Sequence, residues 1–514
     1  MNQSSSHSPH GQAFLPHRCR IPRTIQSLRP RKSIVQTTTR LITLLGGLFA
    51  PTIASGAEAG GRPEPQPMMI APFILLLLAI AIVPFINKHF WERNFHKIAL
   101  GLGLIVVMYY VLGLRDAPRM LTSGIEYIGF MALVGSLFVI AGGIHINMTG
   151  RSTPSSNTAL LALGALLANV VGTTGASMLL IRPFLRINKY RVAPYQVVFF
   201  IFIVSNIGGA LTPIGDPPLF LGYLKGVPFF WLLTKPPVIF AWLLCIGALL
   251  GLFFVMDTIQ FRKHPAQKRE RTKDRIELEG SHNFLWLFII IGLVLAQKAD
   301  WLQGLDAWRG FAMIGNELGW SAQKCAASCV TLAIAALMIG TACLSHKFAN
   351  KNALRENEFS FGPVKEVGFL FIGIFATMVP ALDLLEHHAS SIGITTARQY
   401  FWGSGMLSSV LDNAPTYLNF LTAAFGLHNL SLENPAHVQT FLTDPAMQRY
   451  LVAVSLGSVF FGAVTYIGNG PNFMVKSIAE SSGAKCPSFF GYLLKYSLPI
   501  LITLFAVISI LILT

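Results

Sequence analysis

Two nearly matching interruptions lie inside hydrophobic runs that are long enough to cross a bilayer. Residues 210–218 read Ala-Leu-Thr-Pro-Ile-Gly-Asp-Pro-Pro, and residues 463–471 read Ala-Val-Thr-Tyr-Ile-Gly-Asn-Gly-Pro. Proline and glycine break helices, and a broken helix in lipid leaves backbone groups that protein, water or a bound solute must satisfy. Two such breaks at corresponding places in two halves of a chain are typical of the binding site of a secondary transporter.

The composition excludes a soluble protein. Of 514 residues, 53% are hydrophobic and only 12% are charged, whereas soluble domains carry about 25% charged residues. The apolar runs have the length that crosses a hydrocarbon core of about 30 Å. The net charge of +16 does not indicate nucleic-acid binding, because the basic residues gather in the first 57 residues and in short loops beside apolar runs. We therefore predict an all-α polytopic membrane protein in the lipid bilayer.

Residues 1–67 resemble a targeting segment followed by a linker. A basic, acid-free stretch precedes an apolar run and a group of small residues at 54–59, as in a secretory signal with a cleavage site. A cleaved signal and a multi-pass protein of the cell's inner (plasma) membrane are the prediction. An organelle transit peptide and a start at Met68 or Met69 are alternatives.

The rest of the chain divides by its spans and its loop charges. Basic loops are predicted to lie on the cytoplasmic side, and the tryptophans at 301, 308 and 320 suit an interfacial helix on the outer side. The predicted parts are peripheral N-terminal helices at 68–120, a first transport repeat at 121–256, a cytoplasmic basic loop at 257–282, connecting helices at 283–360, and a second, inverted repeat at 361–514.

Each repeat is predicted to hold a re-entrant hairpin and a discontinuous transmembrane helix. Basic residues flank the stretch 153–186 on both sides, and its centre is polar and rich in glycine. A hairpin that enters and leaves on the same side explains both features, whereas one ordinary span with basic ends is the alternative. The second hairpin is predicted at 395–426, and the discontinuous helices at 195–224 and 449–480.

The four interruptions are predicted to converge on one site. Asn, Thr and free backbone carbonyls offer neutral oxygen ligands for a small hard cation such as Na⁺, and the N-terminal ends of half-helices could instead hold an anionic group. The predicted ion- or substrate-binding residues are Asn169, Thr173, Asn206, Thr212, Gly215, Asp216, Asp412, Asn413, Thr416, Thr465, Gly468 and Asn469.

Two carboxylates lie within these interruptions, at Asp216 and Asp412. An acidic residue at bilayer depth is costly and indicates a function. Either carboxylate can hold a proton or face a sodium ion, so that the two cations compete. With Asn169 and Asn413 they form the predicted Na⁺ ligand set. The alternative is that each Asp caps a half-helix. Arg182, at the exit of the first hairpin, is interpreted as an anchor, with contact to an anion as the alternative.

At these residues the chain resembles the ion transporter superfamily, which includes citrate and dicarboxylate carriers, arsenite efflux permeases and NhaD-type sodium/proton antiporters. The stretch 205–216 is similar to the NhaD-type motif of an Asn, paired glycines and S/T-P-I-G-D, and 411–415 to its D-N-x-P motif. The resemblance implies inverted repeats, often assembled as dimers. By similarity to the carboxylate carriers, Asn169 and Asn413 would stand at hairpin tips that coordinate sodium. Those carriers have Ser-Asn-Thr at both tips, whereas this chain has Ala-Asn-Val and Asp-Asn-Ala.

The leading functional prediction is sodium/proton antiport. A cation-coupled citrate or dicarboxylate carrier is the main alternative, and an arsenite efflux permease is a more distant one. We expect no enzymatic activity and no cofactor, since Na⁺ and H⁺ would be transported ions. The expected partners are small inorganic ions or a small carboxylate, the lipid bilayer and a second copy in a homodimer, with no nucleic acid.

Overall fold

The computed structural model describes residues 64–149, 152–263, 275–299, 302, 320 and 322–513. These residues belong to one compact unit. The predicted targeting segment, up to residue 63, and most of the predicted interfacial helix between residues 302 and 320 lie outside the described part of the chain.

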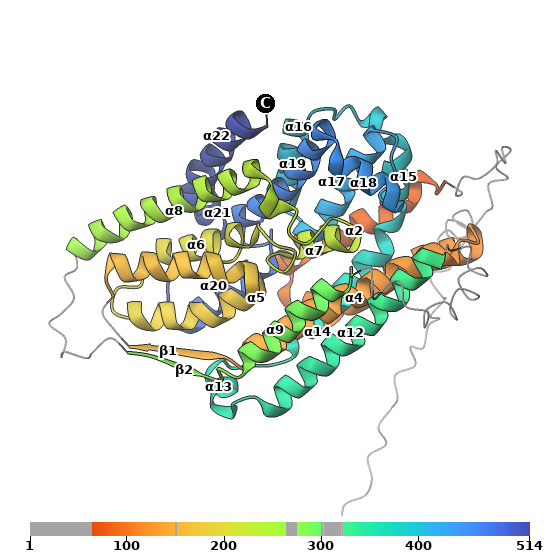
Figure 1. The fold of residues 1–514 in the computed structure, drawn as a ribbon. Coiled ribbons are helices and arrows are strands. Elements are labelled where there is room, and N and C mark those ends of the chain that lie inside the picture. Colours follow the sequence, from red (N-terminus) through yellow and green to blue (C-terminus); the bar gives the residue numbers. More distant parts are fainter. Residues whose placement is uncertain are drawn as a thin grey trace, which may run out of the picture. The chain divides into compact units, whose positions relative to one another are not determined.

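Nine described helices are long and apolar enough to cross a membrane. This confirms the all-α polytopic architecture, and Figure 1 shows several of these helices packed side by side. The helices outside the interrupted regions are α2 (Ala71–Ile86), α3 (Lys88–Met108), α4 (Ala117–Gly142), α8 (Pro236–Lys263), α9 (Asn283–Ala296), α12 (Ala322–Phe348), α13 (Lys351–Glu356), α14 (Gly362–Thr377), α15 (Val379–His388), α18 (Pro435–Thr443), α21 (Phe489–Tyr492) and α22 (Thr503–Ile512). Short 3-10 or π turns extend or join several of them.

The first hairpin is formed by α5 (Pro154–Asn188), which reverses at Gly172. Gly172 has φ 78° and ψ 156°, a backbone conformation that favours glycine. The two ends of α5 meet, because the Asn157 and Asn188 amides exchange hydrogen bonds of 2.8 and 2.9 Å. A straight helix of 35 residues would separate these ends by about 50 Å. The predicted hairpin is therefore confirmed, and the single-span alternative is wrong.

The second hairpin consists of α16 (Ala397–Ser408) and α17 (Asn413–Leu427). Its arms pack through an edge-to-face contact between Tyr400 and Phe420, with ring centroids 6.1 Å apart. Thr396 begins the first arm with a capping box to Gln399, and Asp412 caps the second. The turn between the arms falls inside the predicted interval 395–426.

Both predicted discontinuous helices are observed. The first runs as α6 (Pro194–Ile203), a short 3-10 turn (Ile207–Gly209) and α7 (Pro217–Leu224). The second runs as α19 (Pro445–Phe461), a 3-10 turn (Gly462–Val464) and α20 (Gly470–Ser481). Proline stands in the first turn of α7 and of α20, where its missing N–H costs nothing. The inverted relation between the two halves stays a prediction.

Part of the basic loop is more ordered than its sequence indicates. Helix α8 continues to Lys263, and β2 (Arg275–Glu279) pairs antiparallel with β1 (His145–Thr149). The strand could not be recognised within the charged stretch, because β2 has only two apolar residues in alternation, Ile276 and Leu278. The two strands lie side by side in Figure 1 and tie the connection between α4 and α5, within the first repeat, to the start of the connecting helices.

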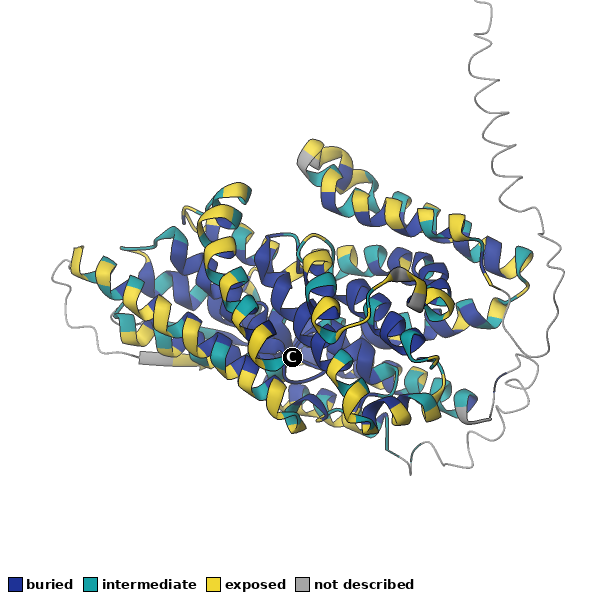
Figure 2. Ribbon diagram, turned by 90° about the horizontal axis from the view of Figure 1, so that it is seen from above, coloured by how far each residue is buried: buried dark blue, intermediate teal, exposed yellow. Residues whose placement is uncertain are grey.

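Buried residues concentrate where the interrupted helices meet. Every residue of α6 except Pro194 is buried, as are nearly all of α17 and most of α19. The peripheral helices instead alternate dark blue and yellow in Figure 2, with exposed residues such as Ile74, Leu104 and Leu337 on their outer sides. Apolar side chains on the outer surface suit contact with lipid. The peripheral helices therefore separate the polar interruptions at the centre from the lipid.

Candidate functional site

A single fully buried carboxylate lies where the four interruptions meet. Asp216 accepts hydrogen bonds from Thr173 Oγ1 at 3.0 Å, Asn413 Nδ2 at 2.9 Å and Asn469 Nδ2 at 3.1 Å. Thr173 comes from the first hairpin, Asn413 from the second, and Asn469 from the second discontinuous helix. The predicted convergence of the four interruptions is thus what the structure shows.

Four helical segments have their N-termini at this site. Helix α7 follows Asp216, α20 follows Asn469, α17 begins at Asn413, and the second arm of α5 begins after Gly172. Each N-terminus carries a partial positive charge from the helix dipole. Together they stabilise negative charge, which is why a buried carboxylate is tolerated here.

Among the described residues, no Lys, Arg or His forms an ion pair with Asp216. Its partners are neutral amides and a hydroxyl, and the nearby Asp412 adds a second negative charge. A buried charge without a counter-charge is unfavourable. A small cation or a proton bound at Asp216 would neutralise this charge.

A layer of amides behind Asp216 holds the two discontinuous helices together. Asn206 Nδ2 donates to Asn472 Oδ1 at 2.7 Å, and Asn472 Nδ2 donates to the carbonyls of Gly462 and Thr465 at 2.7 and 2.9 Å. Asn469 Nδ2 also lies 3.1 Å from Asn206 Oδ1. Asn206 and Asn469 are among the site residues predicted from the sequence, whereas Asn472 is not, although it lies in the same polar stretch directly after Pro471.

Asn169 lies beside the site rather than against Asp216. Its Nδ2 donates to the Gly208 carbonyl at 2.6 Å, and its Oδ1 accepts from the Leu211 backbone N–H at 3.0 Å. Thr212 Oγ1 donates to the Asn169 carbonyl at 2.6 Å. These bonds fix the unwound segment to the hairpin and satisfy backbone groups that the break exposes.

The second half contains an equivalent contact between its unwound segment and its hairpin. The equivalent residues are offset along the hairpin from those that the motifs had paired. In the second half, Thr465 Oγ1 donates to the Ser409 carbonyl at 2.5 Å, as Thr212 does to Asn169. Four residues further along each hairpin stand Thr173 and Asn413, and both donate to Asp216. The structural counterpart of Asn413 is therefore Thr173, one helical turn beyond the Asn169 that the sequence comparison paired with it.

Asp412 and Thr416 shape the start of α17. Asp412 Oδ1 accepts from the Ala414 backbone N–H at 3.1 Å, and Thr416 Oγ1 donates to the Asp412 carbonyl at 3.0 Å. Asp412 is half-buried, and its capping bond agrees with the alternative that the sequence left open. Its role as a sodium ligand stays a proposal.

Gly215 and Gly468 allow each unwound segment to fold back on itself. A Cβ atom added to Gly215 would lie 2.1 Å from the Gly209 carbonyl oxygen, and one added to Gly468 would lie 2.7 Å from that of Gly462. Real Cβ atoms do not approach backbone so closely. These glycines are thus required for backbone approach rather than for ion ligation by a side chain.

We expect Gly215→Ala to shift the unwound segment and to lower the thermal midpoint of the purified protein by several degrees, with loss of transport. The reason is the backbone clash at the Gly209 carbonyl, which no rotamer change can relieve. Gly247→Ala is the matched control, because a Cβ at this position in α8 meets nothing within 4 Å and alanine favours a helix. Equal destabilisation by both variants would contradict the clash.

A small cavity of about 30 Å³ adjoins the site and is lined by Thr173, Thr174, Ile214 and Gly215 among others. This volume suits one or two water molecules or a bare ion, whereas pockets for organic ligands generally measure about 300 Å³ or more. A tricarboxylate is therefore too large for this cavity in the conformation described.

A second charged cluster lies away from the site. Lys225 Nζ contacts Glu126 at 2.7 Å and also Glu433, while Arg119 contacts Asp383 at 2.8 Å and Glu433 at 3.3 Å. Burial alone would raise the pKa of Glu433, but Lys225 and Arg119 hold it well below its usual range. These ion pairs join α4, α7, α15 and the loop before α18, so they act as a structural clamp.

Comparison with known proteins agrees with this architecture. A protein-family model described as "Putative citrate transport" matches residues 64–513. No curated protein matches the sequence. The matched region contains both hairpins, both discontinuous helices and every residue around Asp216. The resemblance to the ion transporter superfamily is thereby confirmed, and the chain belongs to this putative citrate transport family within it.

Proposed function

We propose that this secondary transporter exchanges sodium ions for protons at Asp216. The observation that carries the proposal is the complete burial of this carboxylate among three neutral donors, with no ion pair to a described basic side chain. One carboxylate that must be neutralised can take a proton or a sodium ion, but not both at once. Competition at a single carboxylate is sufficient for coupled exchange.

The neighbouring groups suit this competition. When Asp216 is ionised, Thr173, Asn413 and Asn469 donate to it, as observed. A sodium ion needs oxygen ligands instead, and rotation of either amide by half a turn would present Oδ1 in place of Nδ2. We propose that Na⁺ is held by Asp216, Asn413 and Asn469 with oxygens of the unwound segments, and that Asp412 supplies further negative charge.

Cation-coupled citrate transport is the second candidate, and the family assignment favours it. A carboxylate substrate would require a conformation with a larger cavity than the small one beside Gly215. The cation at Asp216 would then offset part of the substrate's negative charge. Both candidates share Asp216 as the cation site and differ in whether an anion accompanies the cation.

The deciding measurement uses purified protein in proteoliposomes that contain a pH-sensitive dye. We expect addition of Na⁺ or Li⁺ to move protons, while K⁺ and citrate alone do not. Labelled citrate that accumulates only with a sodium or proton gradient would establish the second candidate instead. A protein that moves neither protons nor citrate under any of these gradients would contradict both.

A further inference from the structure

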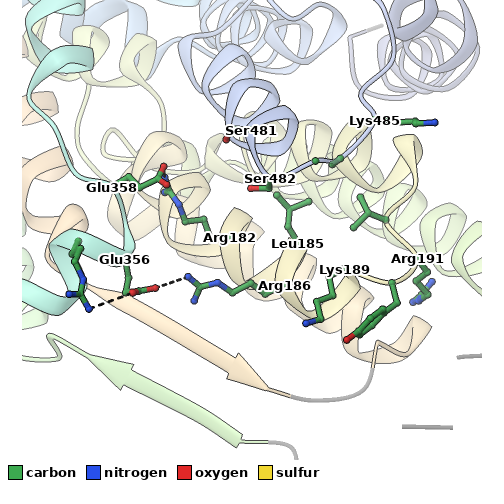
Figure 3. A pocket seen from close by; sticks show the side chains of 15 residues that line it. Arg182, Leu185, Arg186, Lys189, Arg191, Glu356, Glu358, Ser481, Ser482 and Lys485 are labelled. Carbon is green, nitrogen blue, oxygen red and sulfur yellow. Dashed lines mark hydrogen bonds and ion pairs between the residues drawn. The ribbon is translucent and has the colours of Figure 1, made fainter. Parts of the chain in front are cut away.

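An open, basic vestibule lies at the far end of the first hairpin, on the predicted cytoplasmic side (Figure 3). It measures about 780 Å³ and is bounded by the ends of α5, α13 and α20 and by the chain that follows each of them. Its charged side chains number six basic and two acidic: Arg182, Arg186, Lys189, Arg191, Arg355, Lys485, Glu356 and Glu358. Arg191 is neutralised by Asp257, which leaves five basic side chains against the two glutamates. The vestibule is far larger than the cavity beside the Asp216 site. Its positive charge favours anions, whereas the carboxylate of Asp216 favours cations.

The two acidic side chains do not neutralise the vestibule. Glu358 pairs with Arg182 at 3.0 Å, but 77% of its side chain is exposed. Glu356 pairs with Arg186 at 3.0 Å and is 42% exposed. Exposed ion pairs contribute little stability, so a ligand with several negative charges can compete with these glutamates for the arginines.

Part of the basic charge has no protein partner. Arg182 Nη1 is buried and makes no hydrogen bond to any described residue, although its Nη2 bonds Glu358. Lys189 and Lys485 are exposed and form no ion pair within the described part of the chain, although Lys189 Nζ lies 4.9 Å from the centroid of the Tyr190 ring. A guanidinium with a spare donor beside lysines that have no counter-charge is a typical arrangement for recognition of phosphate or carboxylate groups.

We propose that this vestibule binds a multivalent oxyanion, which is either the headgroup of an anionic phospholipid or a free polycarboxylate or phosphate. Basic pockets between transmembrane helices on the cytoplasmic side recognise such groups. The proposal does not depend on whether Asp216 exchanges sodium for protons. It adds an anion site to a protein for which we separately propose a cation site at the centre.

The vestibule is linked to the central site by two half-helices. The arm of α5 that carries Arg182 and Arg186 begins at Thr173, and the end of α20 at Ser481 belongs to the helix that follows Asn469. Thr173 and Arg182 are separated by about 14 Å of helix. Uncompensated positive charge at this distance repels incoming cations, so a bound anion would ease cation entry from this side.

The test measures anion binding to the full-length protein in a neutral detergent. One arm adds cardiolipin and counts retained lipid by native mass spectrometry, and the other titrates citrate and pyrophosphate by calorimetry. We expect Arg186→Gln combined with Lys189→Gln to weaken binding of the anion about tenfold or more. Glu358→Gln should strengthen binding, because it removes the carboxylate that competes for Arg182.

The matched control is Arg262→Gln with Lys263→Gln, which removes the same charge from the exposed end of α8, outside the vestibule. Retained cardiolipin without citrate or pyrophosphate binding assigns the site to a lipid headgroup, and the converse assigns it to a free anion. Should the arginine variant not fold, Glu358→Gln and Lys485→Gln must still change affinity in opposite directions. Absence of binding in both arms, or equal loss in the control, overturns the proposal.

Discussion

Asp216→Asn abolishes sodium-dependent proton movement in proteoliposomes, while the protein still folds. Asparagine has nearly the same shape, and its one carboxamide oxygen can still accept from Thr173 and Asn469, which share one oxygen of Asp216. The Asn413 amide can turn over so that its oxygen faces the new NH₂ group, and the packing around the site is retained. It carries no charge and cannot bind a proton at ordinary pH. Removing the charged partner of a buried ion costs about 3–5 kcal/mol, which corresponds to at least a hundredfold loss of cation affinity.

The matched control for this variant is Asp444→Asn. Asp444 is also the residue before a helix, since it caps α19 by accepting from the Ala446 backbone N–H at 2.7 Å. Unlike Asp216, it makes this bond at an exposed position. Asparagine caps a helix as well as aspartate does, so wild-type exchange is expected. Asp216→Asn that exchanges with an unchanged sodium dependence would eliminate the carboxylate mechanism.

Asp412→Asn separates capping from ion binding at the second hairpin. The cap on Ala414 is preserved, so the thermal midpoint should remain near that of the wild type. We expect the sodium concentration for half-maximal exchange to rise about tenfold, because a negative charge near Asp216 is lost. Sodium titrations of the dye signal measure this shift. An unchanged titration would restrict Asp412 to its capping role.

The duplicated breaks and the hairpins could be predicted because they violate a rule that has few exceptions. Polar residues, glycine and proline are costly inside a lipid-spanning helix, so Asp216, Asn413 and Asn469 stand out from their surroundings. The positive charges on both sides of α5 left a hairpin as the arrangement that keeps both ends on one side. These signals are local in sequence, and the structure places the three residues together.

The hairpin register could not be predicted. Asn169 is the more conspicuous polar residue, but the reversal occurs at Gly172, because only a residue without Cβ adopts φ 78° easily while packing under the Ile214 carbonyl. This moves Thr173 into the site. Asn472 was missed for a similar reason, since its partners Gly462 and Thr465 come close only after the helix has unwound.

A buried charge network at the base of the first hairpin was also not predicted from the sequence. Asp257 borders a basic loop, and an acidic residue in such a place is expected to be exposed to solvent. In the structure Asp257 is fully buried. Arg191 donates to both of its oxygens at 2.7 Å, Tyr195 OH donates at 2.5 Å, and the Asn157 and Gln196 amides each donate at 3.0 Å. One carboxylate on α8 thereby joins the start of α5, the chain just after α5 and the start of α6.

Asp257→Asn should destabilise the protein by about 3–5 kcal/mol, because it leaves the Arg191 guanidinium buried without a counter-charge. Unfolding in a denaturant series, followed by tryptophan fluorescence, measures this loss. Asp257→Asn combined with Arg191→Gln removes both charges and should recover part of the stability, a coupling that a double-mutant cycle quantifies. Glu480→Gln breaks only the exposed pair with Lys476 and should cost less than about 1 kcal/mol. If Asp257→Asn costs no more than Glu480→Gln, the network does not hold the hairpin base. A stable variant of that kind would leave packing alone to position Thr173 against Asp216.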